Sequence, residues 1–493
     1  MSAGKVIVMG GGIAGLTAAA LLVKRGLNVT LIEKEDKVGG YVTGFTRQGF
    51  YFDATGAFLA ASAPGGEFYS ILEELGLEQE LIFEPIRAIR NIYPDFSLDL
   101  DYRNPTAYVQ AIMEQFPEQA EKLQQYIDLT DRLGREFLHF EKAAWWRKLL
   151  LPFLFPTLFR YARHPHSVVL QQLFNNNHNI IQALSALPTT LPPSRLSYIF
   201  VAVMWAKVLK QGVFYPRGGM LAISQALAGA IAGAGGEIIC GQAVQEIRAR
   251  HRNVEQVCLA DGRQLAGDFF IGAMNPYHGE RMLRPGAKLY GSFHDLSRFQ
   301  VSPSALLFYV GLPASALPAD WPYFVSIHTG RDLEEEAAAL AEGSLENGIH
   351  IVITTPSIID PALAPADHHT LKVLVHAPHA GLFGARYGTD QDLEEAQGRI
   401  MQLISQYSGL DIEKEALFVE RATPQTLIRY TNNEEGAMYG LDAACGQVGP
   451  QRPPNRTRLD NLLWVGHYTR PAHGIVGSAL SGSFAANLIQ RHV

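Results

Sequence analysis

Charged side chains are scarce in this chain of 493 residues. Asp, Glu, Lys and Arg together make up 18% of it, whereas about 25% is usual for a globular domain. The 41 basic and 48 acidic residues leave a net charge of −7, so the chain lacks the overall basic field that nucleic-acid binding requires. We therefore expect no nucleic-acid partner.

Cysteine is scarcer still, because only Cys240, Cys258 and Cys445 are present, far apart in the sequence. They form no C-x-x-C pair, and no group of histidines has the sequence spacing typical of a zinc site. We therefore expect no metal. The same scarcity favours a reducing compartment.

Long apolar runs are missing as well. The most apolar runs, residues 149–159 and 198–206, are shorter than the roughly 18 residues that span a bilayer. The apolar N-terminus is interrupted by the glycines at 10–12 and lacks the cleavage site of a secretory signal peptide. We therefore expect a cytoplasmic protein without a membrane-spanning helix.

Acidic residues are absent from one long segment, residues 142–236. Its 95 residues contain nine Lys or Arg and no Asp or Glu. Within it, KAAWWRKLLLPFLFPTLFRYARH combines basic, aromatic and bulky aliphatic residues, a composition suited to the headgroup layer of an anionic membrane. We expect peripheral binding to the cytoplasmic face of a membrane. The alternative is a set of core helices whose polar faces are basic.

The N-terminal sequence KVIVMGGGIAGLTAAALLVKRGLNVTLIEKE predicts a strand, a glycine turn, a helix and a second strand. Gly10, Gly12 and Gly15 form the pattern G-x-G-x-x-G, whose glycines allow a tight turn, close approach of a pyrophosphate and close helix packing. Glu33 ends the second strand 18 residues after Gly15, where a carboxylate can accept hydrogen bonds from a ribose diol. The pattern predicts a dinucleotide site without a 2′-phosphate.

Glycines near both ends of the chain favour FAD over NAD. Gly39 and Gly40 permit the backbone to approach the dinucleotide closely at a second place. Gly466, Gly474 and Gly477 follow the C-terminal strand. A dinucleotide contacted by both chain ends must be long, as FAD is. FAD is therefore the predicted cofactor.

We predict an α/β fold in which a doubly wound, Rossmann-like FAD-binding domain is interleaved with a substrate-binding sheet domain and a helical, membrane-facing portion. Residues 66–140 have a mainly helical pattern, and residues 389–409 predict one amphipathic helix. The predicted FAD-binding domain comprises residues 1–75, 215–285 and 420–493, the helical portion residues 76–214, and the sheet domain residues 286–419.

Six motifs carry a family resemblance over essentially the whole chain. In order they are GGGIAGLTAAALL, EKEDKVGGY, FDATG, FYPRGGM, TPQTLIRYTNNEEGAMYG and NLLWVGHYTRPAHGIVGSALSG. Together they resemble the bacterial-type phytoene desaturases, carotenoid cis–trans isomerases and retinol saturases, which are FAD-dependent oxidoreductases. The first and last motifs are shared with the wider amine-oxidase-like flavoproteins.

The resemblance implies which residues contact FAD. The backbone of Val244 would meet the adenine, and Ile475, Val476 and Gly477 would lie beside the pyrimidine end of the flavin. The implied contacts are Gly10, Gly12, Gly15, Glu33, Lys34, Gly39, Gly40, Tyr41, Val244, Gly466, His467, Ile475, Val476 and Gly477.

No catalytic residue is assigned. His473, Tyr439, Glu434 and Glu435 lie in segments expected near the flavin, but each could equally have only a structural role. The resemblance implies desaturation, saturation or isomerisation of a long hydrophobic polyene, a carotenoid or related isoprenoid. Two alternatives stay open: a flavin amine oxidase on the same scaffold, and a non-catalytic prenyl-lipid escort protein.

Overall fold

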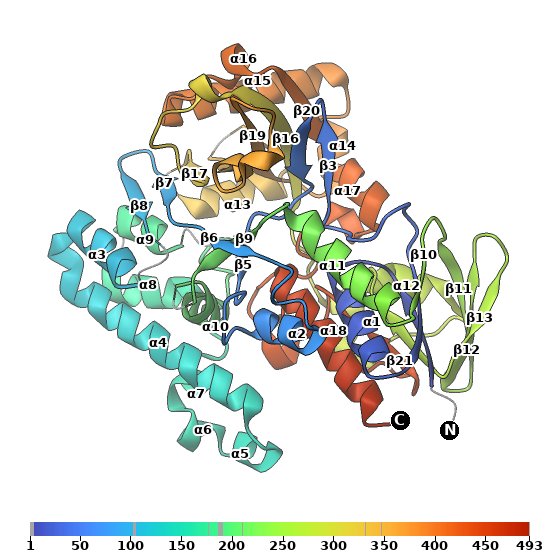
Figure 1. Cartoon of the computed structure of the whole chain (residues 1–493). Coiled ribbons are helices and arrows are strands. Elements are labelled where there is room, and N and C mark those ends of the chain that lie inside the picture. Colours follow the sequence, from blue (N-terminus) through green and yellow to red (C-terminus); the bar gives the residue numbers. More distant parts are fainter. Residues whose placement is uncertain are drawn as a thin grey trace.

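Most of the chain is described by the computed structural model shown in Figure 1. The described residues are 4–101, 105–175, 177–185, 191–209, 211–330, 332–346 and 348–492.

Five short strands from distant parts of the chain form one parallel sheet. In spatial order they are β10 (Glu237–Ile239), β2 (Asn28–Ile32), β1 (Lys5–Met9), β14 (Phe269–Gly272) and β21 (Leu462–Trp464). The three segments predicted for the FAD-binding domain supply every strand of this sheet. The domain boundaries themselves stay predictions.

Alternate side chains of the parallel sheet face two different layers. Val6 and Val8 pack against helices, whereas Ile7 and Met9 pack against a small, mostly antiparallel sheet. The helices are α1 (Ile13–Lys24), α11 (Met220–Gly233) and α18 (Gly474–Gln490), and the small sheet is β13 (Gln264–Ala266), β12 (Asn253–Leu259), β11 (Val244–Arg250) and β15 (Leu283–Arg284). Of these four strands, only the edge strand β15 pairs in parallel. The predicted Rossmann-like α/β fold is confirmed. One of its two covering layers is a β-sheet rather than a row of helices.

Helix α1 is buried on all sides. Every residue from Ile13 to Val23 is buried, because the helix lies between the parallel sheet and the helices α11 and α18. A Cβ atom at Gly482 of α18 would overlap the carbonyl oxygen of Ala14, so glycine is required where α1 and α18 cross. This close contact joins the two ends of the chain (Figure 1).

A second, seven-stranded sheet forms the upper part of the molecule in Figure 1. Its spatial order is β20 (Phe418–Ala422), β16 (Ser304–Pro313), β19 (His368–Ala377), β18 (His350–Thr354), β17 (Phe324–His328), β7 (Ile89–Ile92) and β8 (Ser97–Leu100). One face packs against α15 (Asp390–Ser408), which confirms the helix predicted at 389–409. The other face carries Val352 and Leu374 and borders a cavity described below.

The helical pattern predicted for residues 66–140 is wrong in one stretch. After α2 (Glu67–Leu75), the chain forms β6 (Phe83–Pro85), β7 and β8 before the helices resume. Leu98 and Leu100 are buried while Ser97 and Asp99 are exposed, which is the two-residue period of a strand. β7 also pairs with β17, so a segment assigned to the helical portion extends the larger sheet.

Helices dominate from residue 105 to residue 209. They are α3 (Pro105–Gln115), α4 (Ala120–Lys142), α5 (Trp145–Leu149), α6 (Leu151–Leu154), α7 (Pro156–Tyr161), α8 (His166–Phe174), α9 (His178–Ser185), α10 (Tyr198–Met204) and a π-helical turn, Trp205–Leu209. Figure 1 shows α5, α6 and α7 projecting from the end of α4, away from both sheets. Within the described ranges, no helix combines the length and apolar character needed to cross a bilayer.

Shorter elements complete the fold. They are β3 (Gly44–Arg47), β4 (Phe50–Asp53), β5 (Leu59–Ala60), β9 (Val213–Pro216), α12 (Pro276–Met282), α13 (Leu333–Ala341), α14 (Ala380–Arg386), α16 (Ile412–Glu415) and α17 (Pro424–Thr431).

Candidate active site

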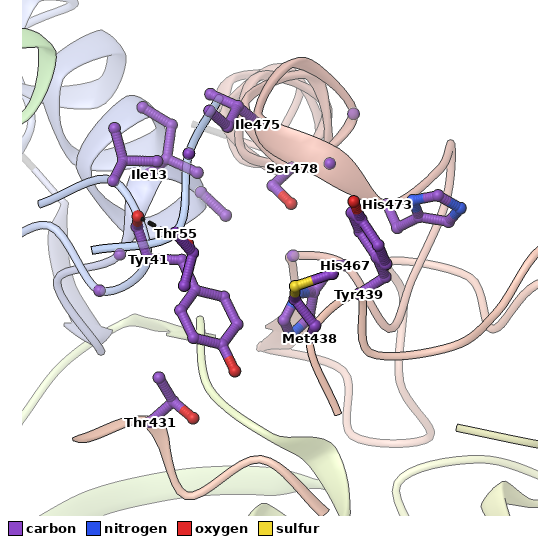
Figure 2. Close-up of a pocket in the computed structure, with 18 of the residues that line it drawn as sticks. Ile13, Tyr41, Thr55, Thr431, Met438, Tyr439, His467, His473, Ile475 and Ser478 are labelled. Carbon is purple, nitrogen blue, oxygen red and sulfur yellow. Dashed lines mark hydrogen bonds between the residues drawn. The ribbon is translucent and has the colours of Figure 1, made fainter. Parts of the chain in front are cut away.

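A large cavity lies between the two sheets. Its volume is about 1260 Å³, and its wall runs from the glycine turn after β1 to the inner face of the seven-stranded sheet. The N-termini of α1 and α18 both open onto it, which directs the positive ends of two helix dipoles into the cavity. Figure 2 shows part of this wall, with Ile13 and Ile475 at the two helix starts.

The glycine turn is shaped for a ligand that approaches the backbone. Gly10 has φ +109, a conformation that L side chains rarely adopt. A Cβ atom at Gly15 would overlap the Gly10 carbonyl oxygen, so Gly15 holds α1 close beneath the turn. A Cβ atom at Gly12 would meet nothing within 4 Å and would project into the cavity. These three glycines therefore have separate functions.

A second turn packs directly on the first. The Gly39 N–H donates to the carbonyl oxygen of Gly11 at 2.8 Å, and Gly39 has φ +129. A Cβ atom at Gly40 would lie 3.3 Å from the Cα atom of Gly12. Both turns line the cavity, and together they form a cradle of bare backbone that suits a pyrophosphate.

Glu33 is held at the end of β2 by two backbone donors. Its carboxylate oxygens accept hydrogen bonds from the N–H groups of Gly11 at 2.7 Å and Glu35 at 3.0 Å. Burial raises the pKa of Glu33, and these two hydrogen bonds oppose that rise. The fixed carboxylate borders the cavity, where it can accept hydrogen bonds from a ribose.

The structure brings the predicted cofactor residues together around one cavity. Gly15 is the exception, since it packs beneath the turn. The residues that line the cavity are Gly10, Gly12, Glu33, Lys34, Gly39, Gly40, Tyr41, Val244, Gly466, His467, Ile475, Val476 and Gly477. The ammonium group of Lys34 is occupied by another contact, because its Nζ atom donates to the Arg429 carbonyl oxygen at 2.5 Å.

The four residues considered for acid–base chemistry are separated by the fold. His473 and Tyr439 line the cavity, and their ring centroids are 5.1 Å apart (Figure 2). Glu434 lies outside the cavity wall and pairs with Arg281 at 3.4 Å, while Glu435 is exposed. Only His473 and Tyr439 are therefore placed to contact a ligand in the cavity.

Burial keeps both rings uncharged. It lowers the pKa of His473 to about 3, with help from the positive charge of Arg452, and it raises the pKa of Tyr439 to about 12. Burial likewise lowers the pKa of His467, which lies on the same wall, to about 3. At neutral pH these side chains can donate or accept a hydrogen bond without introducing charge into the cavity.

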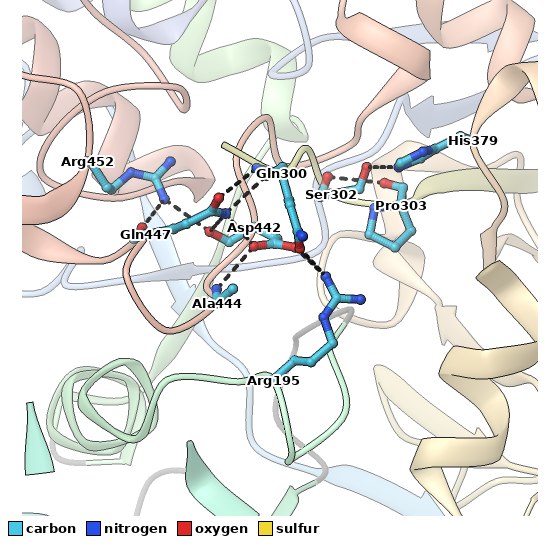
Figure 3. A network of polar contacts seen from close by, with 9 residues as sticks. All are labelled: Arg195, Gln300, Ser302, Pro303, His379, Asp442, Ala444, Gln447 and Arg452. Carbon is cyan, nitrogen blue, oxygen red and sulfur yellow. Dashed lines mark hydrogen bonds and ion pairs between the residues drawn. The ribbon is translucent and has the colours of Figure 1, made fainter. Parts of the chain in front are cut away.

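A buried polar network supports the segment that carries His467 (Figure 3). Arg452 is almost fully buried and donates to the backbone oxygens of His467, Thr469 and Gln447. The Gln447 amide in turn donates to the Asp442 carboxylate at 2.6 Å. Burial raises the pKa of Asp442 to about 6. The network fixes the backbone of the cavity wall.

Arg195 attaches the helical portion to this network. Its guanidinium lies 3.4 Å from the Asp442 carboxylate and donates to the Gln300 side chain at 2.6 Å. Figure 3 shows these contacts on the side of Asp442 opposite Arg452.

A buried lysine beside the cavity was missed at the sequence level. Lys372 of β19 donates to the backbone oxygens of Thr55, at 2.9 Å, and Gly56. The neighbouring Asp53 accepts from Tyr215 at 2.7 Å and from the Met220 N–H at 2.8 Å. The sequence signal for a buried lysine was its position, a single charged residue inside the apolar run TLKVLVHAP. The lysine ties the larger sheet to the loop after β4.

We expect Lys372 to give the free energy of unfolding a particular pH dependence. Burial lowers its pKa from 10.5 to about 8, so between these values the unfolded chain holds a proton that the folded chain has lost, and stability rises with pH. From pH 8 to pH 10, the difference in free energy of unfolding between wild type and Lys372→Met should rise by about 2 kcal/mol. Urea titrations at each pH measure it.

The matched control is Lys122→Met, on the exposed side of α4. This variant should follow the wild-type pH profile. A wild-type minus Lys372→Met difference that is flat over this range would contradict a buried, charged Lys372.

Comparison with known proteins identifies the family. The model of the flavin-containing amine oxidoreductases matches residues 13–490. The chain belongs to this family. FAD is the cofactor of the flavin-containing amine oxidoreductases, so the predicted cofactor and the predicted class, an FAD-dependent oxidoreductase, are confirmed.

Curated relatives of this chain include proteins named as carotenoid enzymes. The chain is 28% identical to an all-trans-zeta-carotene desaturase of Myxococcus xanthus, covering 99% of this chain and 93% of the relative. It is 23% identical to a chloroplastic prolycopene isomerase of Arabidopsis thaliana, covering 98% and 82%. The resemblance found in the sequence motifs is therefore confirmed.

Solved structures support the fold of this amine oxidoreductase family. The cyclohexylamine oxidase of Brevibacterium oxydans superposes with a TM-score of 0.62 at 16% identity, covering 99% of each chain.

Proposed function

We propose that the protein uses FAD to convert a long hydrophobic polyene, a carotenoid or related isoprenoid, by hydride or electron exchange with the flavin. The observation that carries this proposal is the apolar part of the cavity beyond the cofactor cradle. Its wall is formed by Phe200, Val203 and Met204 at the end of α10 and by Val352 and Leu374 of the larger sheet. These five side chains bind a ligand by burial of apolar surface and include no carboxylate. Two carboxylates elsewhere on the cavity wall, Glu67 and Glu420, are ion-paired with Lys207 and Arg47.

The predicted cofactor contacts fit FAD in this arrangement. We assign the pyrophosphate to the turns at Gly10–Gly12 and Gly39–Gly40, the ribose to Glu33 and the adenine to the backbone of Val244. We assign the flavin end to Gly466, His467 and the start of α18. The flavin, when bound, supplies the two-electron and one-electron chemistry.

The side chains around the reacting position would hold and orient the polyene. His473 contacts Phe200, with ring centroids 5.1 Å apart, and Tyr439 contacts His473. Because both polar rings are neutral, they add hydrogen-bonding capacity without the cost of desolvating a charge. The apolar walls exclude water from the conjugated chain.

We also propose that the polyene enters from a membrane. The cavity wall includes Phe137 and Leu138, near the end of α4 from which α5, α6 and α7 project. Six of the thirteen exposed large hydrophobic side chains among the described residues lie on these three helices or, in the case of Leu150, between α5 and α6. They are Trp146, Leu149, Leu150, Phe153, Leu154 and Phe159, and we call them the α5–α7 surface.

Basic residues accompany the α5–α7 surface. Arg147, Arg160 and Arg163 are exposed and make no ion pair within the described part of the chain. Apolar side chains that can enter the acyl boundary, next to cations that can contact anionic headgroups, suit peripheral binding. We therefore propose a peripheral protein on the cytoplasmic face of a membrane.

The function is tested with anaerobic holoenzyme and polyenes in liposomes. Purified protein should be yellow, with flavin absorbance near about 450 nm. Bleaching of oxidised flavin together with a more conjugated product indicates desaturation. Product formed by reduced enzyme without net flavin oxidation indicates isomerisation. Flavin reoxidation together with a shortened chromophore indicates saturation. Reduction of the flavin by amines, with no polyene converted in either redox state, would contradict the proposal.

A cavity variant ties this activity to the apolar wall. Leu374→Trp should lower polyene conversion at least about tenfold by filling the cavity, while the flavin content stays at the wild-type level. Leu374→Met changes the volume little and is the matched control.

A further inference from the structure

Three histidines lie in a row across neighbouring strands of the seven-stranded sheet. His328 of β17 and His350 of β18 are direct partners in the ladder, and their rings stack at 4.2 Å. His376 of β19 is next in the row, with its ring centroid 5.1 Å from that of His350. Directly paired residues of antiparallel strands share one face. All three imidazoles therefore lie on the face that borders the large cavity.

Helix α13 adds a carboxylate to this row. Glu336, His350 and His376 each offer one ligand atom, and these three atoms lie within 4.8 Å of one another. A cavity of about 20 Å³ lies between α13 and the sheet and is lined by these three residues and His328. Such a volume accommodates one water molecule or one ion.

Some nitrogen atoms of this cluster lack the partners that buried polar groups usually have. His328 is 3% exposed, and its Nδ1 atom has no hydrogen-bond partner. Within the described ranges, Glu336 has no ion pair with Lys or Arg but accepts a hydrogen bond from the backbone N–H of His350. The ring nitrogens of His376 have no hydrogen bond to protein among the described residues. The cluster thus has several ligand atoms and few internal contacts.

His350 is oriented as a metal-binding histidine is expected to be. Its Nε2 atom lies 2.7 Å from the Oγ atom of Ser326, which leaves Nδ1 for another contact. A hydrogen bond to the second ring nitrogen fixes the tautomer and orientation of a ligating imidazole.

We propose that Glu336, His350 and His376 bind one divalent transition-metal ion, with Ser326 orienting His350 and with His328 as a further nitrogen at the same cavity. Two imidazoles and one carboxylate suit borderline cations such as Zn²⁺. His350 and His376 also line the large cavity, so the ion would have a coordination position open to it. Three protein ligands and an open position are typical of reactive rather than structural zinc sites.

The test uses tag-free, FAD-loaded protein that has been dialysed against a chelator and then titrated with Zn²⁺ under equilibrium dialysis. Wild type should bind one ion per chain, and Co²⁺ in its place should give the visible bands of a site with nitrogen and oxygen ligands. Glu336→Gln and His376→Ala should each weaken Zn²⁺ binding at least about 100-fold, and Ser326→Ala about tenfold.

The matched control is His251→Asn, in an exposed turn at φ +55 that asparagine tolerates. This variant should bind Zn²⁺ as wild type does. Circular dichroism and flavin content report whether each variant is folded, so a loss of metal in a folded Glu336→Gln protein is interpretable. Failure of wild type to bind Zn²⁺ would overturn the proposal and leave the cluster as a polar end wall for the substrate. Undiminished binding by both ligand variants would also overturn it.

Discussion

Gly15→Ala is expected to yield a folded protein that is purified almost without flavin. The added Cβ atom would overlap the Gly10 carbonyl oxygen and lie 3.0 Å from the Cβ atom of Ala273. Gly10 belongs to the glycine turn, and Ala273, directly after β14, packs against it. The turn must therefore move, and its N–H groups no longer point at the pyrophosphate. Flavin absorbance per chain should fall to about a tenth of the wild-type value or less, which requires FAD binding to weaken by more than tenfold, that is, by more than about 1.4 kcal/mol.

Two further glycine variants separate steric effects from ligand effects. Gly229→Ala in α11 adds a Cβ atom with nothing within 4 Å and should keep its flavin. Gly12→Ala also meets no protein atom, so the apoprotein should be as stable as wild type while FAD binding weakens, because the methyl group enters the cavity. Full flavin content in both Gly15→Ala and Gly12→Ala would show that the cofactor lies elsewhere.

Replacing three side chains of the α5–α7 surface by serine is expected to abolish binding to anionic liposomes. Leu149, Phe153 and Phe159 are 72%, 83% and 56% exposed. Each contributes roughly 1.5–3 kcal/mol when it leaves water for an apolar phase, so the triple variant should bind at least about 100-fold more weakly. Sedimentation with phosphatidylglycerol vesicles measures the bound fraction.

The control for this surface is Phe293→Ser, which removes a side chain that is 69% exposed and far from α5–α7 in the sequence. It should bind vesicles as wild type does, and salt should weaken wild-type binding because the arginines are screened. Equal recovery of wild-type protein in the supernatant with and without vesicles would rule out the membrane proposal.

Local patterns predicted the cofactor part of the molecule well. The β-branched run before Gly10, the glycine spacing and Glu33 are all within one βαβ unit, so their geometry follows from short-range rules. The strands at 89–100 were missed because the dense charge pairs and helical period of the following segment dominated the wider window, although Leu98 and Leu100 alternate with polar residues.

The remaining features depend on contacts between distant segments. Lys372 becomes a buried donor only because β19 lies against the loop after β4. Glu336, His350 and His376 stand on a helix and two strands, and their sequence separations match no zinc pattern. Such clusters are created by strand pairing and are invisible to motif spacing.

The contact between the two chain ends has a consequence for biosynthesis. The N-terminal unit leaves the ribosome well before α18, which covers α1 in the folded protein. Until then, a helix that is buried on every side in the finished protein exposes apolar surface, the kind that promotes aggregation or recruits chaperones. Because Gly466 and the start of α18 share the cavity with the first glycine turn, the proposed FAD site is completed only after α18 has been synthesised.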